Sequence, residues 1–277
     1  MTPNELILQH GRLLLRQDAF HTGEVHAMDT ASIPQYATRE LLNVSLHFDL
    51  PGDVDTWASL VSPNREWADE HFAERVSGEP MNPAPSHVNW PYAQANNARH
   101  TQDGVFSHTY PERFWPKFAN VGQTRPNGRQ VFVPHNGIRY AYGDLGDVVD
   151  LMDRSLYTRQ AFLPVWFPED TGATEKQRVP CTIGYHFIVR PSGVDDAPDR
   201  LHVVYFMRSC DYVRYLRDDI YMAGRLAQWV CDALVVRGHD VFADSLTMHI
   251  TSLHSFVGDD WAIKRQVGNH TITGRNA

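Results

Sequence analysis

The chain has 277 residues, of which 42% are hydrophobic and 21% charged, an ordinary composition for one large globular domain or two small ones. It holds 25 Lys and Arg against 33 Asp and Glu, a formal net charge of −8. This balance argues against binding polymeric nucleic acid, which requires a cationic surface. One nucleotide remains compatible, because a few focused arginines suffice for a single phosphate.

The cysteines, histidines and apolar runs indicate the cellular compartment and whether metals or membranes are involved. The three cysteines, Cys181, Cys210 and Cys231, form no CxxC pair, so we expect a reduced, cytoplasmic setting rather than a disulfide framework. The histidines are scattered without ligand spacing, and we expect no metal. No apolar run reaches ~18 residues, so no membrane span or membrane partner is expected.

The first part of the chain contains patterns that predict one strand, two helices and a long loop. Residues 41–50 alternate like a half-buried strand. Residues 65–78 predict a helix ended by a glycine, and 146–159 predict a second helix. Residues 79–104 are rich in Pro, Asn and His with interleaved aromatic residues, which indicates a long ordered loop rather than a domain linker.

The second half is more informative. Residues 178–193 and 200–211 predict two strands that pair antiparallel across a polar loop. A long helix follows over roughly 211–238, and 244–256 predict a further strand. We therefore expect an α+β fold, a single domain over 1–277 with a mostly antiparallel or mixed β-sheet core flanked by long helices.

The long helix carries an acid on its apolar side. Its apolar face consists of residues spaced three and four apart: Leu216, Ile220, Ala223, Ala227, Val230 and Leu234. Asp219 lies three residues after the first of these and four before the third, so we expect it on the buried stripe, with Asp218 pointing elsewhere. A buried acid costs several kcal/mol unless it is neutralised or hydrogen-bonded. Asp219 therefore either forms a salt bridge with Arg208 or Arg225, or recognises a ligand at the end of a pocket.

Cys181 also allows two interpretations. A free cysteine is most often a small buried hydrophobe. Nearby cations such as Arg159 and Arg208 would favour a thiolate, and they make a nucleophilic role plausible for this side chain.

Several short motifs occur in an informative order. TRQAFLPVW (158–166) is similar to an arginine-bearing strand through which a partner subunit contacts a phosphate. VPC (179–181) is similar to a nucleophile motif, and RSCD (208–211) to a phosphate-binding motif. Together these segments resemble the thymidylate synthase superfamily, which includes the pyrimidine-nucleotide hydroxymethylases.

The spacing of single residues supports this resemblance. Asp219 follows Arg208 by 11 residues, and His249 follows Asp219 by 30, which fits the family without gaps. The match covers about 155–256. A fainter match over 39–115 includes FSHTYPERFW, which resembles the segment that carries an active-site tyrosine, here Tyr110.

The resemblance implies a fold, a reaction and partners. The fold is thymidylate synthase-like, and the protein a homodimer. The thiolate of Cys181 adds to C6 of a pyrimidine nucleoside monophosphate, whose C5 then attacks the co-substrate 5,10-methylenetetrahydrofolate. Arg208 and Ser209 hold the phosphate, and Arg159 reaches it from the neighbouring subunit.

The remaining roles are also implied by the resemblance. Asp211 contacts the folate, His249 a sugar hydroxyl, and Tyr110 belongs to the catalytic residues. The general base of the family lies on a helix that ends in glycine, which indicates Glu70 or Glu74 here, with Glu70 preferred. Both glutamates could instead be solvated helix charges.

Asp219 takes the position at which the uracil-using enzymes carry an asparagine. A carboxyl group accepts a hydrogen bond from the cytosine 4-amino group and shares a proton with N3. Within the family this difference marks the deoxycytidylate (dCMP) 5-hydroxymethylases, so Asp219 is interpreted as the residue that selects cytosine. Such enzymes often serve phages that modify their DNA.

Departures from the family pattern leave alternatives open. Thr182 replaces a histidine, Gln160 a phosphate-binding arginine, and Thr251 a tyrosine beside the sugar, so CMP stays possible. The other phosphate arginines could be Arg12, Arg16 or Arg39.

The folate motif of the methylating enzymes is poorly matched around Glu74 and Arg75, which favours water addition and a hydroxymethyl product. A dCMP C5-methylase, an atypical thymidylate synthase acting on dUMP, and a non-catalytic nucleotide-binding protein remain alternatives.

Overall fold

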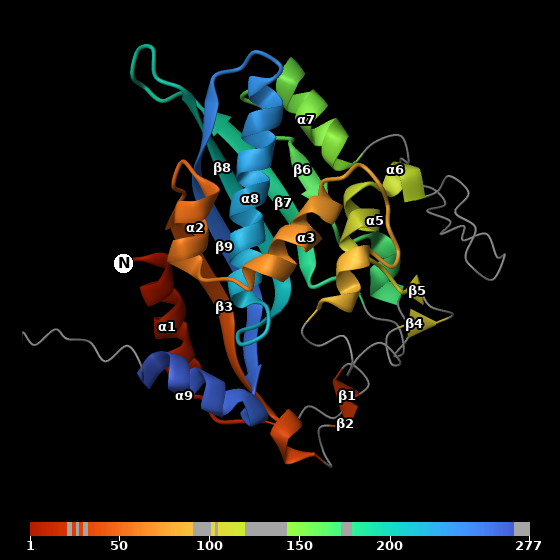
Figure 1. Ribbon diagram of the computed structural model, residues 1–277, viewed down its shortest axis with the longest axis vertical. Coiled ribbons are helices and arrows are strands. Elements are labelled where there is room, and N and C mark those ends of the chain that lie inside the picture. The colour runs from red at the N-terminus through yellow and green to blue at the C-terminus, as the bar shows by residue number, and fades with distance from the viewer. Residues whose placement is uncertain are drawn as a thin grey trace, which may run out of the picture.

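The computed structural model describes residues 1–20, 24–25, 28–29, 33–90, 101–102, 105–119, 143–172 and 179–268. Its centre is a five-stranded sheet of order β3-β9-β8-β7-β6 (Figure 1). Strands β8 and β9 run parallel, and the other neighbours pair antiparallel. The strands of this sheet are β3 (Thr38–Asp49), β6 (Phe162–Pro164), β7 (Thr182–Arg190), β8 (Asp199–Asp211) and β9 (Val241–Phe256).

Helices and short elements surround this sheet. The α-helices are α1 (Pro3–Leu14), α2 (Val54–Val61), α3 (Arg65–Arg75), α5 (Tyr110–Phe114), α6 (Pro116–Ala119), α7 (Leu145–Arg154), α8 (Leu216–Val235) and α9 (Asp260–Gly268). The 3-10 turns are η1 (Pro34–Tyr36), η2 (Pro85–Val88), η3 (Pro168–Gly172) and η4 (Val257–Asp259). Two small hairpins consist of β1 (Glu24–Val25) with β2 (Met28–Asp29), and β4 (Thr101–Gln102) with β5 (Val105–Phe106).

The β8–α8–β9 unit organises the core. Two parallel neighbours need a crossover connection, and α8 supplies it. Figure 1 shows α8 lying along the sheet, with α2 and α3 on the same side. Because α8 follows β8 after a short turn, its first residues lie at the carboxyl end of β8, where open α/β units commonly bind ligands.

A close helix contact fixes α2 against α8. A Cβ atom at Gly224 would collide with the indole of Trp57, and Trp57 Nε1 donates a hydrogen bond to the carbonyl of Tyr221 at 3.2 Å. Glycine at this position lets the two helices approach closely enough for that bond.

The two faces of the sheet differ. Alternate residues of β8, including Leu201, Val203 and Tyr205, are buried beneath the helices. On the opposite face, Phe162 contacts His186 and Phe206, and His249 stacks on Phe206 at 5.5 Å between ring centroids. Phe162 and His249 are exposed on this side of the sheet, and we call this aromatic row the open face.

The predicted α+β class and mixed sheet are confirmed, as is the antiparallel pairing of the two central strands. The predicted helices over 65–78, 146–159 and 211–238 correspond to α3, α7 and α8. The predicted loop over 79–104 contains η2, and its residues 91–100 and 103–104 lie outside the described part. None of the described helices combines the length and apolarity needed to cross a membrane.

Asp218 points away from the apolar stripe, as predicted, but it does not point to solvent. Its side chain is buried, and Oδ1 accepts a hydrogen bond from the backbone N–H of Asn64 at 2.7 Å. The segment between α2 and α3 covers this side of α8, so the face opposite the sheet is also shielded from water. Burial raises the pKa of Asp218 to about 7.

Candidate active site

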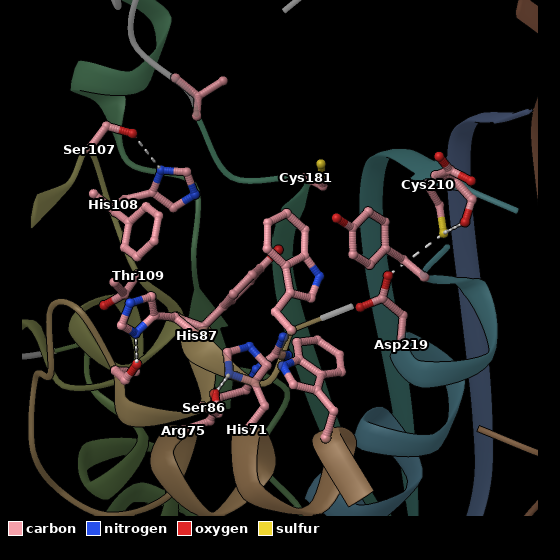
Figure 2. A pocket seen from close by; sticks show the side chains of 18 of the residues that line it. His71, Arg75, Ser86, His87, Ser107, His108, Thr109, Cys181, Cys210 and Asp219 are labelled. Carbon is pink, nitrogen blue, oxygen red and sulfur yellow. Dashed lines mark hydrogen bonds between the residues drawn. The ribbon is translucent and has the colours of Figure 1, made fainter. Parts of the chain in front are cut away.

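A cavity at the carboxyl end of β8 collects most of the predicted site residues. It encloses about 1100 Å³, part of it open to solvent. The predicted residues that line it are Tyr110, Cys181, Ser209, Asp211 and Asp219. They come from α5, the start of β7, the end of β8 and the first turn of α8, and Figure 2 shows Cys181 and Asp219 among the lining side chains.

Arg208 holds the VPC segment (179–181) in place. Its Nε and Nη2 donate to the carbonyls of Pro180 and Val179 at 2.8 and 3.0 Å, and Nη2 lies 3.9 Å from Cys181 Sγ. The thiol is partly exposed, so Cys181 is not the inert core residue of the alternative interpretation. A guanidinium at this distance favours a thiolate electrostatically. Arg208 itself is not among the residues that line the cavity.

Asp219 is half-buried because it borders the cavity. Its Oδ2 accepts a hydrogen bond from Cys210 Sγ at 3.7 Å. Burial raises the pKa of Asp219 to about 6, while Arg75 and Cys210 act to lower it. Neither predicted salt-bridge partner contacts this carboxyl group, since Arg208 binds carbonyls and Arg225 pairs with Asp69.

A hydroxyl network anchors the tyrosine beside the thiol. Thr182 Oγ1 donates to Tyr110 Oη at 3.1 Å and is hydrogen-bonded to Tyr205 Oη at 2.7 Å. Burial and the nearby Cys181 raise the pKa of Tyr110 well above its ordinary value. Thr182, noted above only as a departure from the family, therefore positions Tyr110 in the cavity.

One face of α3 forms a wall of the cavity. Trp67, His71 and Arg75, spaced four residues apart, all line it. His71 stacks on Trp67 at 4.8 Å, and the Arg75 guanidinium lies 4.0 Å from the centroid of the Tyr110 ring. The motif comparison did not identify these three residues as site residues, although their i, i+4, i+8 spacing was a usable signal.

Glu74 orients His71. Its Oε2 lies 3.3 Å from His71 Nδ1 and accepts from Ser86 Oγ at 2.6 Å. Burial alone would raise the pKa of Glu74, but hydrogen bonds from His71 and Ser86 outweigh it and lower that pKa. Burial and the nearby Arg75 lower the pKa of His71 to about 4, so the imidazole is neutral near pH 7.

The two candidate glutamates are clearly different. Glu70 is exposed and accepts a hydrogen bond from Asn89 Nδ2 at 2.9 Å, as a solvated helix charge would. Glu74 is buried behind His71 and Ser86, which line the cavity. The preference for Glu70 therefore has no support in the geometry, which favours Glu74.

His249 does not reach the cavity. It is exposed on the open face, stacked on Phe206. His254 lies five residues later in the same strand, where an odd separation reverses the side-chain direction. Its Nδ1 is 3.3 Å from Ser209 Oγ, and burial lowers its pKa. His254 is thus the histidine placed next to a predicted phosphate residue.

Asp211 has partners inside the protein. Its Oδ1 accepts from the backbone N–H groups of Val213 and Arg214 at 2.9 and 3.0 Å, and its Oδ2 pairs with Arg214 Nη1 at 2.7 Å. These contacts hold the turn between β8 and α8. They leave less of the carboxylate for the predicted folate contact.

The other predicted arginines lie outside the cavity. Arg159 is exposed just before β6, and its carbonyl accepts from His186 Nε2 at 3.0 Å. It therefore sits at the edge of the open face. Arg39 is ion-paired with Asp260 at 3.0 Å.

Comparisons of the chain with models of known protein families and with curated proteins found no match. The superfamily resemblance thus rests on the motifs and their spacing. Within the described ranges no cluster of three or more His, Cys, Asp or Glu has the arrangement of a metal site.

The raised pKa of Asp219 predicts a pH-dependent stability. Its folded-state pKa lies above the unfolded value, so its contribution is fully present below about pH 4 and is lost as pH rises through about 6. Asp219→Asn should remove that loss. Urea unfolding at pH 4.5 and 7.5 should show the variant gaining on the order of 1–3 kcal/mol relative to wild type at the higher pH.

Asp218→Asn provides a matched comparison. It should show the same sign with a midpoint nearer pH 7, because burial raises that pKa further. A difference between Asp219→Asn and wild type that is equal at both pH values would contradict the buried carboxyl group described above.

Proposed function

We propose that the protein transfers a one-carbon unit from 5,10-methylenetetrahydrofolate to C5 of a cytosine nucleotide, as a thymidylate synthase-like dCMP 5-hydroxymethylase. The observation that carries this proposal is the shared cavity: a thiol beside a guanidinium and a half-buried carboxyl group both border it. A pyrimidine ring offers C6, to which a thiolate can add, and on another edge the 4-amino group and N3, which a carboxyl group can bind.

Cys181 is the proposed nucleophile. Its Sγ adds to C6 of the ring, and Arg208 at 3.9 Å stabilises the thiolate before attack. Ser209, with His254 beside it, provides hydrogen-bonding groups for the phosphate at the end of β8. A protein that only binds nucleotides would not need a thiol at this point.

Asp219 is proposed to select the base. With a pKa near 6 it can accept from the 4-amino group of cytosine and share a proton with N3. Against uracil, an ionised carboxylate would face the lone pairs of O4. A mispaired buried polar group costs roughly 1–3 kcal/mol, which corresponds to about one to two orders of magnitude in selectivity.

His71 is the proposed base for the proton at C5. That hydrogen is replaced by carbon during the reaction, so a group near the ring must accept it. With Nδ1–H donated to Glu74, the Nε2 atom keeps a lone pair, and the Glu74 carboxylate stabilises the imidazolium that forms.

The cavity also fits the folate co-substrate. Trp90 stacks on Tyr215 at 6.0 Å, and Trp67 and Phe106 add further aromatic surface. Flat faces of this kind suit a planar heteroaromatic group. When bound, the folate supplies the one-carbon unit. Arg75 and His71 on α3 bring polar groups to the same wall, which supports water addition at the final step and a hydroxymethyl product.

The open face suits a second copy of the chain. It presents Phe162, Phe206 and His249, and Phe162 is 38% exposed. Exposed aromatic clusters of this kind are typical of protein interfaces. Arg159 lies at its edge, so a homodimer formed through this face would bring Arg159 towards the neighbouring subunit.

The product mass tests the reaction directly. Incubation with methylenetetrahydrofolate and either dCMP, dUMP or CMP should give a product from dCMP that is heavier by about 30 mass units, because water adds to the C5 methylene group. A gain of about 14 units would indicate a methylase. Turnover of dUMP in preference to dCMP would contradict the role of Asp219. Preference for CMP would mean that the substrate carries ribose rather than deoxyribose.

A pair of glutamate variants tests the base. Glu74→Gln should lower kcat by about 10–100-fold, because His71 loses its carboxylate partner, and should slow tritium release from [5-³H]dCMP equally. Glu70→Gln is the matched control and should stay within about twofold of wild type. A larger loss of kcat in Glu70→Gln than in Glu74→Gln would instead assign the carboxylate role in proton removal to Glu70.

Complementation tests the dimer. Arg159→Ala and Cys181→Ser should each be inactive alone, because every site would lack one component. Co-expressed at equal levels, half of the dimers would carry one intact site, which restores about a quarter of wild-type activity. No recovery, or a fully active monomer, would contradict a shared site.

A further inference from the structure

Arg75 is a buried cation without a polar partner. Arg75 is the last residue of α3. It is 3% exposed and lines the cavity. Its Nε has no hydrogen-bond acceptor, and across the described residues its guanidinium forms no ion pair. The guanidinium does lie over the Tyr110 ring, 4.0 Å from its centroid, which compensates part of the lost hydration. Charged groups are nevertheless seldom buried without a polar partner, because desolvation is costly.

Other buried or half-buried arginines have polar partners, either carboxylates or, as for Arg208, backbone carbonyls. Arg113 forms a two-bond contact with Asp170 at 2.8 Å for each bond, and Arg225 pairs with Asp69. Near Arg75, the Asp219 carboxyl group acts on it only electrostatically, without an ion-pair contact. Both residues border the same cavity, so a ligand there can contact the two together.

A second unsatisfied donor lies on the same helix face. Trp67 Nε1 is buried without an acceptor among the described residues, and Trp67 also lines the cavity. Two donors, eight residues apart on one face of α3, thus border the cavity with no acceptor in the part of the chain that the structure describes. Such an arrangement is completed by a ligand that brings acceptor oxygens.

We propose that Arg75 is a second specificity-determining residue, which donates hydrogen bonds to the O2 carbonyl of the pyrimidine ring while Asp219 holds the amino edge. This proposal rests on the proposed function and extends it to a residue for which the superfamily resemblance gave no ligand role. The planar guanidinium is always charged and holds its N–H donors in a fixed geometry, so it can direct a charge-assisted hydrogen bond at a single carbonyl oxygen.

The contact also affects bond formation. When Cys181 Sγ bonds to C6, the C5=C6 π bond breaks and its electron pair moves through C4 onto N3 and O2. Asp219 can supply a proton at N3, and Arg75 stabilises the charge at O2. Donors placed where charge develops lower the barrier more than they strengthen ground-state binding.

Thermal unfolding with and without dCMP tests the proposal. Arg75→Met removes an uncompensated charge, so the ligand-free variant should melt at the wild-type temperature or higher. The upward shift given by saturating dCMP in wild type should disappear. Arg225→Met is the matched control: loss of a paired arginine should lower the ligand-free Tm while leaving the dCMP-induced shift unchanged.

A second variant covers the possibility that Arg75→Met folds poorly. Arg75→Lys keeps the charge but loses the fork, and should form the covalent 5-fluoro-dCMP adduct about 10–100-fold more slowly than wild type, with dCMP binding weakened less. An unchanged dCMP shift in Arg75→Met, or an unchanged adduct rate in Arg75→Lys, overturns this proposal alone. No dCMP shift in wild type overturns the proposed function as well.

Discussion

The junction between β8 and α8 determines where the candidate site of this protein lies. Asp211 fixes the turn by accepting two backbone N–H groups and pairing with Arg214, so α8 starts in a defined direction. Asp219 then enters the cavity from the first helical turn. Within β8, the backbone N–H of Arg208 donates to the carbonyl of Cys181, directly before the neighbouring strand β7, at 2.9 Å. The sheet register therefore sets the thiol and the carboxyl group on the border of one cavity.

The charges in this cavity are arranged for a ligand rather than for the stability of the empty protein. Asp219 is a half-buried acid without an ion pair, Arg75 is a buried cation without one in the described residues, and His71 is held neutral beside Glu74. The first two arrangements cost folding free energy, because an ionised group loses hydration without gaining an ion-pair partner. Proteins keep such groups at functional sites, where a substrate completes the missing contacts.

Much of the framework could be predicted from the sequence, because β7, β8, α8 and β9 carry regular apolar periodicity and clear turns. The burial of Asp218 was not predicted, because helix periodicity identifies the face towards the sheet but not the loop that covers the opposite face. His249 and His254 share a strand, and only the register shows which of them meets Ser209. Glu74 and His71 acquire their significance from Ser86, in a segment whose path no periodic pattern gives.

The proposed reaction requires one pyrimidine ring to bond to Cys181 while Asp219 holds its amino edge. Intact-mass analysis after incubation with 5-fluoro-dCMP or 5-fluoro-dUMP and methylenetetrahydrofolate addresses both halves at once. The account predicts a covalent adduct with 5-fluoro-dCMP on the peptide that contains Cys181, little adduct with 5-fluoro-dUMP, and the reverse preference in Asp219→Asn. No adduct at Cys181, or the same base preference in both proteins, would contradict it.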